Sequence, residues 1–293
     1  MPTVKELRVR IRSLRNTRKI TAAMQLVASA KYRKAQAALL RSRPWAERTE
    51  ELCSRAVAAA GTAHPLAEPR EVRRARVIVA SSDRGLCGSF NNRAIGEALR
   101  LCAELSARGK EVEVVAVGRR ALDRFAADPA FAASAPPEET RGDAGRTAAA
   151  LAESAAADFL SKKVDEVWIV YNRFESMLSQ RPTSAKLLPA ETDPAPAGAE
   201  DGRRVAPEES LFEPSPAALL DVLLPLRLRA RTLLALLESQ AGEHGARMAA
   251  MDNATRNSGD LIDRLTLMAN RARQSAITTE LTEIVSGAEA LKS

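Results

Sequence analysis

Near both ends of the chain, apolar residues recur at the three- and four-residue steps that mark one face of an α-helix. The amino-terminal set comprises Val4, Leu7, Ile11 and Leu14. The carboxyl-terminal set comprises Leu261, Leu265, Met268 and Ala272, and a second stripe beyond it comprises Ile277, Leu281, Ile284 and Ala288. Each end therefore predicts a long helix whose apolar seam needs a partner, and we expect the two ends to pair.

The placement of proline agrees with two long helices. Residues 1–60 contain no glycine and carry proline only at Pro2 and Pro44, and no proline follows Pro225. Because proline lacks an amide hydrogen and clashes with the preceding turn, we expect Pro44 to kink or interrupt the first helix. By the same argument, Pro225 should start or bend the second helix. The first helix should end near Gly61.

Between these ends the pattern changes to short β-branched runs separated by helical stretches. Strands are predicted at residues 75–82, 111–118, 164–174 and 181–189, and helices at 90–107, 119–127 and 146–162, with a connecting segment at 129–145. Strand, helix and strand within about 45 residues indicate a crossover unit of a parallel sheet. The last strand should lie at an edge, because Pro182 cannot donate a hydrogen bond to a neighbouring strand.

These patterns predict an α/β protein with a long antiparallel coiled coil. The N- and C-terminal helices would form a shaft, and the centre would form a small Rossmann-like domain with a parallel sheet. The expected divisions are an N-terminal coiled-coil helix at 1–60, a central α/β domain at 70–190, a proline-rich loop at 191–214, and a C-terminal coiled-coil helix at 215–293.

Positive charge is concentrated at the amino end. Residues 1–48 hold 13 lysines and arginines against two glutamates, whereas the whole chain has a net charge of +7. A basic helix of this kind can meet nucleic acid, anionic lipid or an acidic protein surface. One alternative is therefore a basic coiled-coil protein that binds nucleic acid. Against it, aromatic residues make up only 3% of the chain, which leaves little for stacking on bases.

The turn SSDRGLCGSFNN, at 81–92, follows a predicted strand and opens a predicted helix, which is where phosphate-binding loops lie. It has neither the GxGxxG pattern nor a Walker lysine. The turn is therefore better explained as a tight connection in which Gly85 and Gly88 supply unusual backbone dihedrals.

Cys87, in the same turn, suggests an enzyme with a cysteine nucleophile as a further alternative. Its base would have to be His64 or His244, the only two histidines, and both lie in other predicted segments. Asp83 and Arg84 are adjacent opposite charges that fit a role in fixing the turn. The three cysteines have no metal-ligand spacing, so the sequence predicts no catalytic residue, no cofactor and no metal site.

Three blocks of sequence are specific enough to indicate a family. They are RIRSLRNTRKITAAMQLVASAKYRKAQ at 10–36, SSDRGLCGSFN at 81–91, and ARMAAMDNATRNSGDLIDRLTLMANRARQSAITTELTEIVSGAEAL at 246–291. In these blocks, and over essentially its whole length, the chain resembles the gamma subunit of bacterial F-type ATP synthases. The resemblance implies a non-catalytic rotor stalk that transmits torque between the proton-driven c ring and the catalytic alpha/beta hexamer. Proton translocation would thereby be coupled to ATP synthesis or hydrolysis.

The resemblance also implies partners and a location. One copy would assemble with three alpha and three beta subunits, the epsilon subunit and the c ring, and none would bind nucleic acid. Membrane association would occur only through the c ring, so the chain would be peripheral, on the cytoplasmic face of the bacterial plasma (inner) membrane. The basic first helix would lie among acidic loops of the alpha/beta ring.

Two partner-binding surfaces follow from the resemblance. The surface for the alpha/beta ring comprises Met24, Arg273, Gln274, Thr278, Glu280, Thr282, Glu283 and Ile284. The foot, next to the c ring and epsilon, comprises Phe212 and Glu213. The family pattern has a tyrosine at the Phe212 position, so a role for a phenolic hydroxyl is not carried over.

Overall fold

The computed structural model describes residues 3–60, 64–190, 213 and 215–290, with side chains described up to residue 286. The chain divides into two compact units. Residues Met1–Ser29 and Arg247–Ser293 form the first unit, and Ala30–Ala246 form the second. Two long helices, α1 (Val4–Ala60) and α5 (Pro216–Ala290), contribute to both.

In the first unit, α1 and α5 pack antiparallel through an apolar seam. Its buried members are Leu7 and Ile11 of α1 and Ile262 and Ala269 of α5, flanked by half-buried Leu14, Leu265 and Ala272. Two polar contacts add to the pairing within this unit. The hydroxyls of Thr21 and Thr255 lie 2.7 Å apart, and Gln25 donates to Asp252 at 3.0 Å. The predicted pairing of the two ends is therefore confirmed.

The α5 side of this seam differs from the predicted stripe. Leu261 and Met268 are 46% and 47% exposed, whereas Ile262 and Ala269 are 7% and 8% exposed. The true stripe keeps Leu265 and Ala272 but contains Ile262 and Ala269 in place of Leu261 and Met268, because apolar residues occupy both neighbouring positions at these two places. Periodicity alone could not choose between the two, and contact with α1 decides it.

Both long helices contain an internal proline without being interrupted. α1 runs through Pro44 and α5 runs from Pro216 through Pro225, so neither proline interrupts or starts a helix, and of the expected alternatives only a kink or bend remains. A proline removes one backbone hydrogen bond from a helix, and tertiary packing can offset that loss. Near Pro44, buried Leu39 supplies such packing.

The second unit is built on a five-stranded sheet with the order β3-β2-β1-β4-β5. The strands are β1 (Arg74–Ala80), β2 (Glu111–Val117), β3 (Ala132–Ser134), β4 (Glu166–Phe174) and β5 (Gln180–Leu188). The first four are parallel, as expected. β5 lies at an edge, as Pro182 predicted, but it pairs antiparallel with β4, so the sheet is mixed instead of wholly parallel. Strand β3 was missed, because three small residues carry no recognisable strand pattern.

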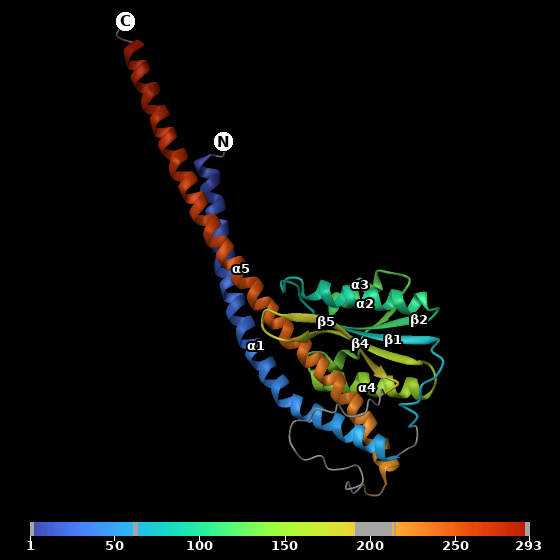
Figure 1. The fold of residues 1–293 in the computed structure, drawn as a ribbon. Coiled ribbons are helices and arrows are strands. Elements are labelled where there is room, and N and C mark those ends of the chain that lie inside the picture. Colours follow the sequence, from blue (N-terminus) through green and yellow to red (C-terminus); the bar gives the residue numbers. More distant parts are fainter. Residues whose placement is uncertain (1–2, 61–63, 191–212, 214, 291–293) are drawn as a thin grey trace. The chain divides into compact units, whose positions relative to one another are not determined.

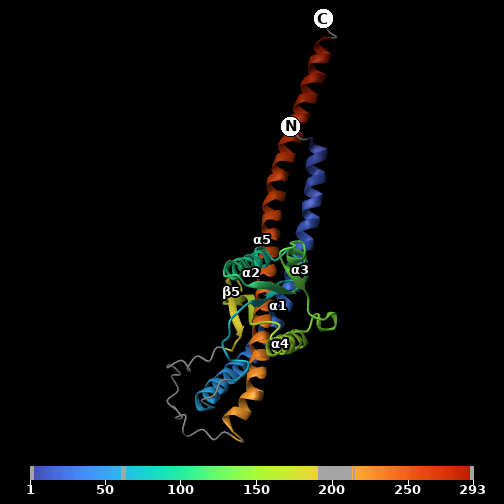
Figure 2. The ribbon, with the colours of Figure 1, turned by 90° about the vertical axis from the view of Figure 1, so that its right-hand side faces the viewer.

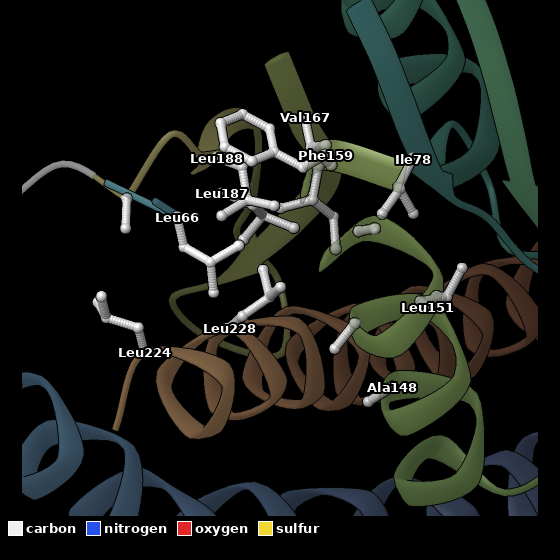
Figure 3. Packing of buried hydrophobic residues seen from close by; sticks show 14 of the residues in the cluster. Leu66, Ile78, Ala148, Leu151, Phe159, Val167, Leu187, Leu188, Leu224 and Leu228 are labelled. Atoms are coloured by element: carbon white, nitrogen blue, oxygen red, sulfur yellow. The ribbon is translucent and has the colours of Figure 1, made fainter. Parts of the chain in front are cut away.

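Helices cover both faces of this sheet (Figure 1). On one face lie α2 (Phe90–Ala107) and α3 (Arg119–Ala126), whose buried residues include Leu101 and Phe125. On the other face lies α4 (Ala144–Leu160), together with the segments of α1 and α5 that belong to this unit. Figure 3 shows Phe159 of α4 and Leu228 of α5 in the hydrophobic core on this second face. Burial on both faces explains why β1 contains the continuous apolar run 77–80 instead of an alternating pattern.

A partly buried ion pair joins α1 to α5 within the second unit. The Arg227 guanidinium donates to both carboxylate oxygens of Glu50, at 2.8 and 2.5 Å. Burial of Glu50 would raise its pKa, but the hydrogen bonds and charges of Arg227 and Arg231 outweigh this and lower it. The carboxylate therefore stays ionised and holds the two helices in one register.

Candidate partner-binding surfaces

The carboxyl-terminal part of α5 is exposed on all sides. Every residue from Arg273 to 286 is exposed, and the last seam contact with α1 is made by Ala272. Figures 1 and 2 both show α5 continuing past the first turn of α1. This stretch is therefore a single helix with every side accessible to a partner.

An apolar stripe runs along this exposed stretch. Ile277, Leu281, Ile284 and Val285 are 48%, 57%, 67% and 59% exposed. An isolated exposed leucine is ordinary, but several large aliphatic side chains on one helix face mark an interaction surface. Ile284, expected at the alpha/beta ring, is the most exposed of the four.

The polar residues assigned to the same surface are all exposed: Arg273, Gln274, Thr278, Glu280, Thr282 and Glu283. Two of them use their hydroxyl hydrogens within the helix. Thr278 donates to the carbonyl of Gln274 at 3.0 Å, and Thr282 donates to that of Thr278 at 2.8 Å. These threonines offer a partner a methyl group and an acceptor oxygen, but no free hydroxyl donor.

Met24 lies on α1 and is half-buried. It is flanked on the same helix face by Ile20 and Val27, at steps of four and three, and these are 59% and 57% exposed. Met24 is therefore the inner member of an exposed apolar strip on α1 that was not predicted. The steps of four and three residues between its members are visible in the sequence.

A cationic groove lies along α1 in the first unit. Exposed Arg8, Arg12, Arg15, Arg18 and Lys19 line it, together with Thr266 and Asn270 of α5. Among the residues that the structure describes, no carboxylate forms a salt bridge with these five cations. Their charge is therefore available to an acidic partner.

The turn between β1 and α2 has a structural role. Gly88 has a φ of 58°, as expected, but the second left-handed residue is Leu86, with a φ of 63°, and not Gly85. A Cβ atom at Gly85 would lie 2.9 Å from the end of the Arg120 guanidinium, so a larger residue there would displace this side chain. Asp83 accepts a hydrogen bond from the backbone amide of Arg119 at 3.0 Å and so caps α3.

Cys87 is 1% exposed, and Asn91 donates a hydrogen bond to its sulfur at 3.2 Å. His64 instead contacts Asp221 at 3.1 Å. The geometry of the turn thus brings no imidazole into hydrogen-bond contact with this thiol in the described part of the chain. Nor, among the described residues, do three histidine, cysteine or acidic side chains converge as metal ligands.

Comparison with known proteins decides the family. A family model described as ATP synthase matches residues 3–291. The ATP synthase gamma chain of Pelotomaculum thermopropionicum is 43% identical over 100% of both chains. That of Paracoccus denitrificans is 42% identical over 99% of this chain and 100% of its own. The chain belongs to the ATP synthase gamma-chain family. As a member, it is a non-catalytic subunit of an F-type ATP synthase and forms the central rotor stalk.

Solved mitochondrial structures share the fold of this gamma chain. A chain of the Euglena gracilis ATP synthase, in an assembly of OSCP, F1 and c-ring, aligns with a TM-score of 0.65 at 19% identity, over 98% of this chain and 94% of that one. A chain of the Tetrahymena thermophila central stalk and c-ring aligns with a TM-score of 0.55 at 20% identity, over 80% of this chain and 99% of that one.

The two residues assigned to the foot are described unequally. Phe212 lies outside the described residues, and Glu213 is exposed. None of the described helices is both long and apolar enough to cross a bilayer.

Proposed function

We propose that this gamma chain transmits torque between a proton-driven c ring and a catalytic alpha/beta hexamer, and so couples proton translocation to ATP synthesis or hydrolysis. In this proposal residues 1–60 and 215–293 act as the shaft, 70–190 as the body, and 191–214 as a connecting loop. One observation supports it above the others: α5 ends in a solitary helix, from Arg273 onward, with an exposed apolar stripe.

An asymmetric helix end can act differently on identical neighbours. Ile277 and Leu281 present an aliphatic surface on one side of the helix, whereas Thr282 and Glu283 present polar groups on other sides. Three chemically identical beta subunits around this helix would each meet a different face. A difference in contact free energy of about 1.4 kcal/mol changes a conformational equilibrium tenfold, so each rotary position would favour a different open or closed state.

In this proposal each exposed surface is assigned a partner. The apolar end of α5, the Met24 strip and the cationic groove of α1 would face the alpha and beta subunits, with one gamma chain for three of each. The solved Tetrahymena relative is titled as central stalk with c-ring. By analogy, the foot with Phe212 and Glu213 would meet the c ring and epsilon, and the gamma chain would be peripheral on the cytoplasmic face of the plasma membrane.

The test is ATP hydrolysis by alpha and beta subunits of the same organism, with and without this chain, together with the stoichiometry of the complex. We expect strong stimulation at one gamma chain per three alpha and three beta subunits, and a complex that survives nuclease treatment. Arg273→Ala with Gln274→Ala should reduce stimulation about tenfold or more, because both groups contact the ring. Arg108→Ala, at an exposed site after α2, is the matched control.

Folded protein that forms no complex and gives no stimulation would overturn the proposal. Loss of binding after nuclease treatment would point instead to the nucleic-acid alternative, for which the cationic groove would be the binding surface. Equal activity of the Arg273/Gln274 double variant and the Arg108 control would remove the assigned pair from the ring surface while leaving the rest of the proposal standing.

A further inference from the structure

Two glycines of α5 lie where the β4–β5 hairpin touches the backbone of the helix, inside the second unit. A Cβ atom at Gly242 would lie 3.1 Å from Gln180 Cγ and 3.2 Å from Phe90 Cε2. A Cβ atom at Gly245 would lie 3.1 Å from the carbonyl oxygen of Met177. Both are tight contacts, so the absence of a side chain is what allows the hairpin to approach α5 this closely.

A buried carboxylate lies one helical turn before these glycines. Glu238 is 5% exposed, and its Oε2 accepts a hydrogen bond from the backbone amide of Phe174 at 3.1 Å. Arg43 of α1 lies 3.6 Å from Oε1, and burial raises the pKa of this carboxyl group. A carboxylate costs free energy to bury, so its place here is explained by the bond to the end of β4 rather than by packing.

Further contacts fix the β4–β5 hairpin to its neighbours. The Gln180 side chain donates to the carbonyl oxygens of Met177 and Ser176, at 2.7 and 3.2 Å. Arg93 of α2 donates to the Gln180 carbonyl at 3.4 Å. The end of β4 also touches α1, where the rings of Tyr32 and Phe174 lie 6.1 Å apart. The hairpin therefore moves with the sheet and α2 as one piece.

The contact allows only one register along α5. A slip by one helical turn, about 5.4 Å, would bring Glu238 or Ala246 to the place of Gly242. Either side chain would meet Gln180 and Phe90 at the distances given above. Where two elements pack through ridges of side chains, one can shift by a helical turn and pack again. Where the hairpin packs on glycine backbone, such a shift would first require the hairpin to move away from α5.

From this geometry we infer that Glu238, Gly242 and Gly245 form a fixed joint that fastens the α/β body to α5, so that torque applied to the body reaches the helix without slip. The inference rests on the proposed function, and it names the residues through which that function would act. The joint is a positioning device and contacts no nucleotide.

The joint can be tested in the whole ATP synthase, assembled in lipid vesicles, by measuring ATP hydrolysis and proton pumping together. One variant locks the contact: Met177→Cys with Gly245→Cys. A Cβ at Gly245 would lie 3.5 Å from Met177 Cα, so the two Cα atoms are within about 5 Å, which suits a disulfide. The native cysteines do not interfere, because Cys53, Cys87 and Cys102 are all buried.

A second variant wedges the contact open. Gly245→Leu places a branched side chain against the Met177 carbonyl. Its matched control is Gly96→Leu, also inside a helix, where a Cβ atom would meet nothing within 4 Å. Assembly stoichiometry and hydrolysis rate report whether each variant folds and joins the complex, and the ratio of protons pumped to ATP hydrolysed reports slip.

A fixed joint predicts that oxidation of the cysteine pair leaves pumping unchanged. It also predicts that the wedge lowers the pumping ratio by about twofold or more relative to the Gly96 control, because overpacking displaces packed segments. Pumping that is lost on oxidation and restored by reduction would show that the hairpin slides on α5 during turnover, and would overturn the joint. The joint would also be overturned if Gly245→Leu gave the same ratio of protons pumped to ATP hydrolysed as Gly96→Leu. A wild-type complex that hydrolyses ATP without pumping would instead overturn the proposed function, and the joint with it.

Discussion

The seam of the first unit can be tested by comparing two neighbouring residues of α5. Ile262→Ala removes three carbon atoms from a side chain that is 7% exposed. At roughly 0.8 kcal/mol for each buried carbon, the transfer free energy is about 2.4 kcal/mol. A seam between two helices is open at its sides and can close over the gap, so the total should stay near the low end for such substitutions, roughly 2–3 kcal/mol.

The matched control is Leu261→Ala, which the apolar spacing alone would have ranked as the more damaging change. Leu261 is 46% exposed. The control should cost about 1 kcal/mol or less, since it removes little buried surface and alanine is the better helix former.

Amide hydrogen exchange is the suitable assay, because the first unit can open without unfolding the α/β body. For Ile262→Ala, amides between residues 255 and 270 should exchange about 30- to 150-fold faster, since each 1.4 kcal/mol is a factor of ten. Amides of β1 should not change in either variant. Faster exchange in Leu261→Ala than in Ile262→Ala would refute the assignment of the seam.

Two further predictions concern the α/β body. Gly118 has a φ of 94°, and a Cβ atom there would lie 2.3 Å from the Ser81 carbonyl oxygen, so Gly118→Ala should lower the free energy of unfolding in urea by about 3 kcal/mol or more. Gly109→Ala, with a φ of 77° but nothing within 4 Å, should cost only about 1 kcal/mol, and equal losses would contradict the steric argument. The hydrogen bond from Arg76, at 2.7 Å, lowers the pKa of Asp158, so its stabilisation is present at neutral pH and is lost as the pH falls through the lowered pKa. The stability difference between wild type and Asp158→Asn should therefore shrink below about pH 4, and a constant difference would contradict the assignment.

Local pattern was sufficient for most elements of the central body. The helix predicted at 90–107 is α2, and the strands predicted at 75–82 and 111–118 are β1 and β2, each within a residue or two. These elements carry their own signals, namely β-branched runs, glycine turns and helical spacing. The partner-binding residues were not available from such signals. They came from the resemblance of three sequence blocks, and for most of them the structure adds only that they are exposed.

The sequence by itself determined which segments are helices and which are strands, because local spacing of residues carries that information. It also determined the family, through ordered blocks of residues. Only the tertiary structure decided that Ile262, and not Leu261, faces α1, and that Pro44 lies inside a continuous helix. It alone placed Glu238 against the end of β4. Each of these depends on contacts between residues far apart in the chain. The free energy of such contacts exceeds the local conformational preferences on which a prediction from sequence pattern depends.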